Sequence, residues 1–574
     1  QLPFLVGLEK FTLERYPGSN SPSSFASDVI VQDSTADKVL RQKIFMNNVL
    51  DYRGYRFFQS SYMPDEHGTI LSVNHDWWGT NITYLGYLLM SIGMLLSLFM
   101  KGSRFRELGG KVQKVKDAGK TVAILAIIGL TSHQSYAQLG NPIDKEHAEK
   151  FGEIISQTQE GRLMPMHTVA LNVLRKVHRK DFYQTKNGEK LTATQVYLDM
   201  QINQKAWLDE QFILVSVKDF REEFDLTSKY VPMHEFYLPN KHADYKLTED
   251  VRAANQKSEK DKGKRDKELI KVNDRVQSMN MALTGYFTQI YPNPSDTSDR
   301  WHNPQQAMMF RYKDSTIAAV QYLKYLSHLK KAKIHGNYDT CNVIVDEIIA
   351  TQRSRSNDVM PSFDRVEREI WYNNSNIFDR VSTIYALLGF ILLIILFIQI
   401  FVHHREKLNK TLSVIARVLS WLVGIAFILH GLGLGLRWYI ADHAPWSDGY
   451  EALVFISFVV VGAGIGFARK YKIVLALAAI LSYLMLFVAH MDIMNPEITQ
   501  LVPVLKSYWL KIHVAVITSS YAFLGIGCMI GLLNIVLSIV IFSKRMRGSK
   551  RNLKHLRLGL HCLSSILQLW KLPR

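Results

Sequence analysis

Apolar residues are gathered in long runs in the first quarter and the last third of the chain, with charged sequence between them. In a bilayer every backbone polar group must be bonded within the protein, so apolar runs of about 18 residues predict membrane-spanning helices. Seven segments are assigned as spans, namely 81–100, 121–135, 384–403, 414–436, 452–467, 473–488 and 513–542. We therefore predict a polytopic α-helical membrane protein with about seven spans.

Basic clusters set the orientation of these spans. They follow apolar segments directly, at 101–106, 403–410, 469–472 and 543–551. The positive-inside rule assigns such flanks to the cytoplasm. Residues 1–80, 139–378, 438–451 and 491–512 then lie on the outer side. These flanks and a charged central segment account for the formal net charge of +18, so no nucleic acid is expected as a partner.

The polar regions predict two kinds of extracytoplasmic structure. Residues 1–80 carry short alternating runs bounded by Pro, Gly, Ser and Asn, which predict a β-rich segment. Within them, DYRGYRFFQSSY at 51–62 predicts a half-buried strand with an aromatic cross-strand ladder. Residues 139–378 show helical periodicity and predict a mainly helical domain. The charged run 249–274 predicts a solvated helix or a linker.

This pattern divides the chain into five parts. They are an extracytoplasmic segment at 1–80, two spans joined by a basic cytoplasmic loop at 81–138, an extracytoplasmic soluble domain at 139–378, a five-span domain at 379–545, and a basic tail at 546–574. The tail predicts a basic amphipathic segment that lies on the inner membrane surface.

Motifs for covalent chemistry are missing from the sequence. Cys341, Cys528 and Cys562 are widely spaced and form no CxxC or CxxCH pattern. Covalent c-type haem attachment to this chain is therefore excluded, and a disulfide framework is not expected. Residues 139–378 contain no convincing nucleophile elbow, phosphate loop or metal-spaced cluster, so no catalytic residue is assigned.

Histidines gather at the predicted outer membrane surface. His430 lies within a span, His443 in the following loop, and His490 and His513 flank the next loop. Imidazole is a common iron ligand, and paired histidines hold b-type haem. Histidines at helix ends also serve as simple polar caps. Spacing alone leaves both interpretations open and slightly favours the caps.

Arg437 begins the polar exit from the span of His430. The two residues are seven apart and share one helix face, and His430 is expected roughly 12 Å below Trp438. Arg437 or Lys506 could pair with haem propionates. The nearby aromatic residues, among them Trp446, fit either a pocket wall or the usual interfacial belt of membrane proteins.

Three long segments resemble one known family. Residues 46–87, MNNVLDYRGYRFFQSSYMPDEHGTILSVNHDWWGTNITYLGY, resemble the end of CcsB (ResB) proteins. RWYIADHAPWSDGYEALVF and NPEITQLVPVLKSYWLKIHVAVITSSYAFLGIG resemble CcsA (ResC) proteins. The chain thus resembles the fused CcsB–CcsA (ResB–ResC) proteins of System II cytochrome c biogenesis, with a β-rich start and a helical membrane domain.

The resemblance implies a function and a site. Such proteins carry haem transiently and non-covalently across the bacterial inner (plasma) membrane and present it to apocytochrome c, as part of a holocytochrome c synthase (haem lyase). It implies a multi-pass protein with large periplasmic domains, and the lipid bilayer and thiol-reducing proteins of the pathway as partners. By motif, His513 in YWLKIHV matches the first outward axial iron ligand. His430 and His490 are weaker candidates, and Arg437, Trp438 and Trp446 would line the cofactor site.

The sequence departs from the family pattern at both ends, and the N-terminal spans of CcsB, which carry an in-span histidine, are not found. The Trp-rich signature WGxxWxWDPKETW is not found, and the resemblance is not followed beyond Ser543. We therefore expect a member truncated at both ends. This leaves an alternative function, a structural or docking subunit of the maturation machinery that binds no haem itself. A b-type electron-transfer subunit would need paired histidines within the spans, and only His430 lies clearly in one.

Overall fold

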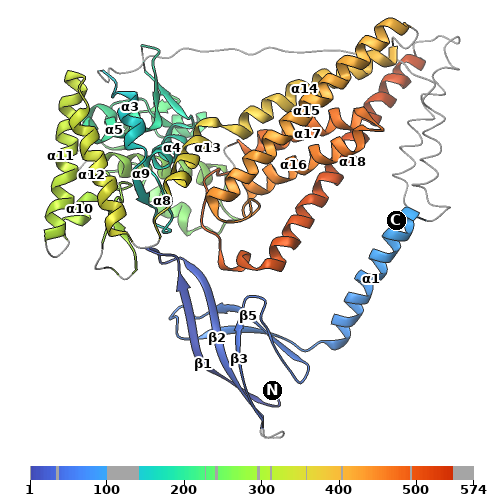
Figure 1. Ribbon diagram of the computed structural model, residues 1–574, viewed down its shortest axis with the longest axis horizontal. Coiled ribbons are helices and arrows are strands. Elements are labelled where there is room, and N and C mark those ends of the chain that lie inside the picture. The colour runs from blue at the N-terminus through green and yellow to red at the C-terminus, as the bar shows by residue number, and fades with distance from the viewer. Residues whose placement is uncertain are drawn as a thin grey trace. The chain divides into compact units, whose positions relative to one another are not determined.

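The computed structural model falls into two compact units, which are described separately (Figure 1). Unit 1 comprises Gln1–Glu14, Pro22–Ile128 and Asn376–Arg574, and unit 2 comprises Arg15–Ser21 and Gly129–Ser375. The structure describes residues 2–33, 38–99 and 141–546, except 186, 227, 239–243, 294, 295, 297, 310–312, 357, 358, 402–404, 492 and 493.

The first part of unit 1 is β-rich, as predicted. Two three-stranded antiparallel sheets have the orders β1-β2-β3 and β4-β5-β6. The strands are β1 (Leu5–Arg15), β2 (Pro22–Asp33), β3 (Lys38–Phe45), β4 (Leu50–Tyr52), β5 (Tyr55–Tyr62) and β6 (Thr69–Asn74). Their shared core contains Phe4, Val29, Val31, Ile44, Leu50 and Phe57.

The predicted aromatic strand is a hairpin of β4 and β5. Arg53 and Gly54 both have positive φ, 48° and 80°, as a tight two-residue turn between strands requires. The ring of Phe4 packs edge-on against Tyr52 at 4.9 Å and against Tyr55 at 5.5 Å. The aromatic side chains of this segment therefore pack against the N-terminal strand rather than only against one another.

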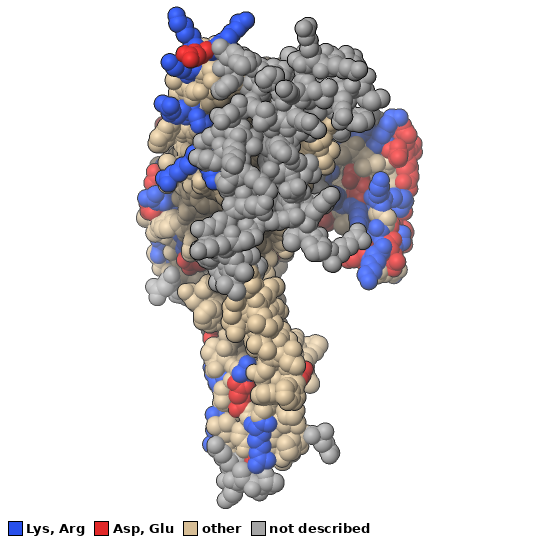
Figure 2. All heavy atoms as spheres, turned by 90° about the vertical axis from the view of Figure 1, so that its right-hand side faces the viewer, with Lys and Arg blue, Asp and Glu red and all other residues tan. Residues whose placement is uncertain are grey.

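Apolar helices make up the rest of unit 1. Helix α1 (Trp77–Phe99) covers most of the predicted span 81–100. Figure 2 shows a tan surface with few charged side chains below the grey atoms, on the side where α1 lies in Figure 1; residues 77–93 include no Lys, Arg, Asp or Glu. The later helices are α14 (Ile377–Phe401), α15 (Glu406–Ala441), α16 (Gly449–Ala468), α17 (Lys472–Ala489), the short η2 (Pro503–Lys506) and α18 (Tyr508–Met546).

Five helical segments in the described residues are long and apolar enough to cross a membrane. One runs from Phe363 to Gln399 and includes most of α14, and the others correspond to α15, α16, α17 and α18. The predicted span 81–100 overlaps α1, which is not one of these five segments, and the predicted span 121–135 lies outside the described residues, so the prediction of seven spans is not confirmed. The predicted spans 414–436, 452–467, 473–488 and 513–542 fall within α15, α16, α17 and α18, and residues 384–401 of the predicted span 384–403 lie in α14.

The helices of the bundle pack through small residues. Helix α14 packs against α15 and α17, and α16 packs against α15, α17 and α18. A side chain at Gly464 of α16 would place its Cβ 2.5 Å from Cβ of Ala478 on α17, so only glycine allows this approach. Small residues at helix contacts let backbones come close in lipid, where no hydrophobic force draws apolar helices together.

Unit 2 is mainly helical. Its helices are α3 (Lys145–Phe151), α4 (Met166–His178), α5 (Ala193–Ile202), α6 (Gln204–Leu208), α7 (Lys218–Glu223), η1 (Met233–Phe236), α8 (Thr248–Gln256), α9 (Lys264–Leu283), α10 (Pro304–Ala307), α11 (Lys313–His335), α12 (Asp339–Arg355) and α13 (Phe363–Ser375). Short antiparallel pairs join β7 (Ile155–Gln157) with β8 (Leu163–Pro165), β9 (Phe182–Gln184) with β10 (Lys190–Thr192), β11 (Ile213–Leu214) with β12 (Tyr230–Val231), and β13 (Tyr291–Pro292) with β14 (Trp301–His302).

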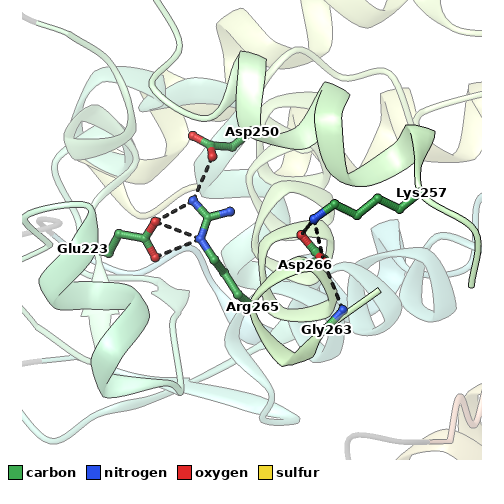
Figure 3. A network of polar contacts seen from close by, with 6 residues as sticks. All are labelled: Glu223, Asp250, Lys257, Gly263, Arg265 and Asp266. Atoms are coloured by element: carbon green, nitrogen blue, oxygen red, sulfur yellow. Dashed lines mark hydrogen bonds and ion pairs between the residues drawn. The ribbon is translucent and has the colours of Figure 1, made fainter. Parts of the chain in front are cut away.

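For the charged run 249–274 the sequence predicts a solvated helix or a linker. The structure has helices there, so the linker prediction is wrong. The run forms α8 and most of α9, and α9 buries Leu269, Val272, Val276 and Met279 in the main core of unit 2. Most of the charged side chains of this run are exposed, whereas Asp266 is buried and paired. Arg265 donates hydrogen bonds to Glu223 and Asp250, and Asp266 accepts from Lys257 and the Gly263 amide (Figure 3).

Candidate functional site

The hairpin between α15 and α16 is a capped connection. Helix α15 ends at Ala441, and Asp442 takes a left-handed conformation with φ 61° while its amide donates to the carbonyl of Trp438. Helix α16 begins after Asp448, whose Oδ1 accepts a hydrogen bond of 2.8 Å from the amide of Glu451. Such capping satisfies an amide that has no partner within the helix. The hairpin thereby fixes where Arg437 and Glu451 enter and leave the bundle.

Arg437 and Glu451 form a buried ion pair at this end of the bundle. Nε of Arg437 lies 2.8 Å from Oε1 of Glu451, and each side chain is 1% exposed. The other carboxylate oxygen, Oε2, accepts from the amide and the hydroxyl of Ser447, at 2.9 and 2.7 Å. The guanidinium also lies over the ring of Tyr450, 5.1 Å from its centre. Both charges are therefore compensated inside the protein, as burial requires.

The same hairpin holds the next outer loop. Nη1 of Arg437 donates to the carbonyl of Pro496 at 3.0 Å, and Nη2 donates to that of Glu497 at 3.3 Å. Nε2 of His443 lies 3.1 Å from the carbonyl of Thr499 and Nδ1 lies 3.3 Å from that of Ala444, so the tautomer with its proton on Nε2 donates to the loop. We call Arg437, His443 and Glu451 the loop clasp. Its partners are backbone atoms of residues that precede α18.

The two predicted tryptophans lie beside the clasp. The rings of Trp438 and Trp446 meet nearly at right angles, 5.8 Å apart, and Trp446 also packs on Phe455 at 4.8 Å. Trp438 is half exposed. Nε1 of Trp446 is buried and has no hydrogen-bond partner among the described residues. Arg437, Trp438 and Trp446 are thus brought together, as their spacing predicts.

His430 lies apart from this group, deep in the bundle. Its side chain is fully buried, and the rings of Phe378, Tyr385 and Phe458 surround it at 5.5 to 5.9 Å. Nδ1 is 3.4 Å from the hydroxyl of Tyr385, while Nε2 has no hydrogen-bond partner in the part of the chain that the structure describes. An imidazole enclosed on three helices has no open side for a large ligand.

His490 and His513 flank the clasped loop. His490 ends α17, where Nδ1 lies 2.7 Å from the carbonyl of Leu486, and its ring lies 6.0 Å from that of Tyr450. His513 is in the second turn of α18 and is exposed. Trp509, one turn earlier on the same face, is 70% exposed. His490 and His513 are both exposed, with one ring nitrogen of His490 bonded to its own helix, whereas His430 and His443 are buried.

The predicted ligands fit a haem unequally. No group of three or more metal-ligating side chains occurs in the described residues, but axial ligation of haem iron needs only single imidazoles. His513, exposed beside an exposed tryptophan, has the access that an axial ligand needs. Arg437 does not fit as a propionate partner, because it is buried and its donors are engaged by Glu451 and two carbonyls.

Two features of the site were not predicted from the sequence. Glu451 was not among the predicted site residues, although the spacing Asp448-x-x-Glu451 is typical of a helix start and predicts its place in the first turn. The role of His443 as a backbone anchor has no local sequence signal, because Thr499 lies 56 residues further along the chain.

Both ends of the chain match known protein families. The ResB-like family matches residues 1–69, and the family described as Cytochrome C assembly protein matches residues 446–569. One polypeptide thus carries a ResB-like match at one end and a cytochrome c assembly match at the other. The second match runs past Ser543, the residue beyond which the sequence resemblance was not followed.

Individual relatives agree with this assignment. The chain is 34% identical over 553 residues to Protein NrfI of Wolinella succinogenes, a match that covers 94% of this chain and 59% of NrfI. It is 32% identical over 158 residues to Cytochrome c biogenesis protein CcsA of Prochlorococcus marinus (strain MIT 9215), covering 27% of this chain and 49% of that protein. CcsA of Guillardia theta is 36% identical over 109 residues, or 18% and 36%. With five helices long and apolar enough to cross a membrane, the chain is a membrane protein. It spans less than two thirds of the length of these relatives.

Proposed function

We propose that the chain acts in cytochrome c maturation, where it binds haem non-covalently at the outer membrane surface and presents it to apocytochrome c. The observation that carries the proposal is the pair of family matches at the two ends of one polypeptide, ResB-like at 1–69 and cytochrome c assembly at 446–569. The second match contains the start of α18 with His513.

His513 is the proposed axial ligand. Its imidazole is exposed on α18 and can approach iron without breaking a contact with another described residue, whereas His430 would first have to leave three enclosing rings. Trp509 offers a flat apolar surface next to it. When bound, the haem supplies vinyl groups that react with the thiols of an apocytochrome CxxCH motif. The chain itself supplies binding and orientation.

The charges at the ends of the bundle support an orientation. Arg469 and Lys470 lie between α16 and α17, and Arg405, Lys407 and Lys410 lie at or just before the start of α15. At the opposite ends of α15 and α16, Asp442 and Asp448 flank the hairpin and Glu451 is paired with Arg437. The positive-inside rule assigns the basic ends to the cytoplasm. The clasp and His513 then face the periplasm of a bacterial inner membrane.

Absorption spectroscopy tests the ligand. The full chain is purified in detergent from haem-replete cells, and its reduced spectrum is recorded for the wild type, His513→Ala and His513→Gly. We expect a haem band that His513→Ala removes, and that added imidazole restores in His513→Gly. His335→Ala, on an exposed histidine of α11, is the matched control and should keep the band. A band unchanged in both His513 variants contradicts the assignment.

The same absorption spectrum distinguishes haem binding by this chain from the alternative function. The alternative is a docking subunit of the maturation machinery that binds no haem itself. For such a subunit the wild type shows no haem band, yet an apocytochrome peptide with a CxxCH motif still crosslinks to the full chain. Haem binding and peptide binding together support the first proposal.

A further inference from the structure

The loop before α18 has little structure of its own. Between the end of α17 at Ala489 and the start of η2 at Pro503, the described residues form no helix or strand. Val502 and Val504 near its end are 53% and 46% exposed, so apolar packing holds this stretch weakly. A segment of this kind keeps one conformation only if other parts of the protein bind its backbone.

The clasp supplies those backbone contacts at three nearby positions. Arg437 donates to the carbonyls of Pro496 and Glu497, and His443 donates to that of Thr499. Glu451 accepts from Nε of Arg437 and so turns the planar guanidinium with both Nη atoms toward the loop. A guanidinium offers five donors in a fixed fork, which suits an acidic side chain on one edge and two carbonyls on another.

We propose that Arg437, His443 and Glu451 are positioning residues that hold loop 495–502, and through η2 the start of α18, so that His513 is presented at a fixed place. Helix η2 is separated from α18 only by Ser507, and η2 packs against α18. Helix η2 also packs against β2, and Ser507 accepts a hydrogen bond from Asn47, so the clasp acts together with these contacts on the first turns of α18, which carry His513. The part of this inference that concerns haem rests on the proposed function, whereas the clasp itself does not.

Arg437→Lys separates the clasp from a simple ion pair. Lysine keeps a positive charge for Glu451, but a single ammonium group cannot contact the carboxylate and both carbonyls in one plane. The matched control is Arg417→Lys, which makes the same change at an exposed position of α15. Hydrogen–deuterium exchange of the detergent-solubilised full chain reports the loop without any need for haem.

We expect peptides within 494–507 to exchange at least about ten-fold faster in Arg437→Lys than in the wild type, and peptides of α16 and α17 to be unchanged. Arg417→Lys should match the wild type everywhere. If loop exchange in Arg437→Lys equals that of the wild type, or rises equally over the whole bundle, the clasp is overturned. His443→Phe, which keeps a ring and removes the donor, should accelerate exchange near Thr499 in the same way.

The haem spectrum tests the second half of the proposal. We expect Arg437→Lys to lower haem occupancy or shift the reduced band while His335→Ala leaves both unchanged. Faster loop exchange with an unaltered band overturns the positioning of His513 and leaves the clasp in place. A wild-type chain without any haem band contradicts the proposed function and still leaves the exchange result to decide on the clasp.

Discussion

Arg437 on α15 and Glu451 on α16 are joined by a 2.8 Å contact between Nε and Oε1, with both side chains 1% exposed. A buried pair contributes little net stability over apolar residues of the same size, but removal of one partner leaves an uncompensated buried charge. The pair therefore has to be tested by changing one residue at a time.

Glu451→Gln should lower the stability of the bundle. It leaves the Arg437 charge without its carboxylate and replaces one acceptor for Ser447 with a donor. We expect a loss of about 3–5 kcal/mol, visible as a lower midpoint in thermal unfolding of the detergent-solubilised chain. Glu406→Gln makes the same change at the exposed start of α15 and should shift the midpoint little. Equal shifts in the two variants contradict the account.

His430→Ala should reduce stability without removing the haem band. The fully buried imidazole fills the space between Phe378, Tyr385 and Phe458, and its loss leaves a cavity that costs about 2–4 kcal/mol. Thermal unfolding measures the loss, and the reduced spectrum measures haem. A variant that keeps its stability but loses the band assigns His430 as a ligand after all.

The membrane helices could be predicted from the sequence because a single physical signal, a long apolar run, determines them. The β-rich start followed from strand propensities in the same way. The clasp could not be predicted. Arg437 and Glu451 are 14 residues apart on two helices, and whether they meet depends on how α15 and α16 face each other. The enclosure of His430 likewise depends on three helices at once.

The prediction of a solvated helix or linker at 249–274 missed the buried face of α9. Its many charges obscured Leu269 and Val272, which continue with Val276 and Met279 at spacings of three or four and form the buried face of α9. The regular spacing of apolar residues along the whole helix predicts its buried face, whereas the charge content of residues 249–274 does not.

The ion pairs of unit 2 should differ in importance according to their burial. Arg265, Glu223 and Asp250 are 38–44% exposed, and water screens such a network (Figure 3). Lys333 and Asp199 are 10% and 5% exposed, and Asp199 also accepts from Nε1 of Trp207. We expect Arg265→Gln to cost less than about 1 kcal/mol, and Asp199→Asn to cost about 3 kcal/mol or more.

Pulse proteolysis of the solubilised full chain in increasing urea measures both values, with cleavage sites in unit 2 identified by mass spectrometry. Salt supplies an independent check, because 0.5 M NaCl should reduce the small effect of Arg265→Gln and leave that of Asp199→Asn almost unchanged. A loss for Arg265→Gln as large as that for Asp199→Asn contradicts the argument from burial.

Acid should destabilise unit 2 through His178. Burial lowers the pKa of this imidazole from 6.5 to about 4, since its ring is stacked on Phe212 and packed near Tyr183 and Tyr230. Between pH 6.5 and 4 the unfolded chain therefore binds a proton that the folded chain does not. The free energy of unfolding falls as the pH is lowered through this window, by about 3 kcal/mol from this group alone.

Replacement of His178 by a residue that does not titrate should remove this part of the pH dependence. Burial also lowers the pKa values of His147 and His167, so a smaller dependence remains in His178→Gln. Pulse proteolysis at pH 7, 5 and 4 compares the wild type with His178→Gln and with His335→Gln, whose histidine is exposed. We expect His178→Gln to be less stable at pH 7 and to lose less on acidification, whereas His335→Gln follows the wild type. Parallel curves for all three proteins show that His178 does not carry the acid sensitivity.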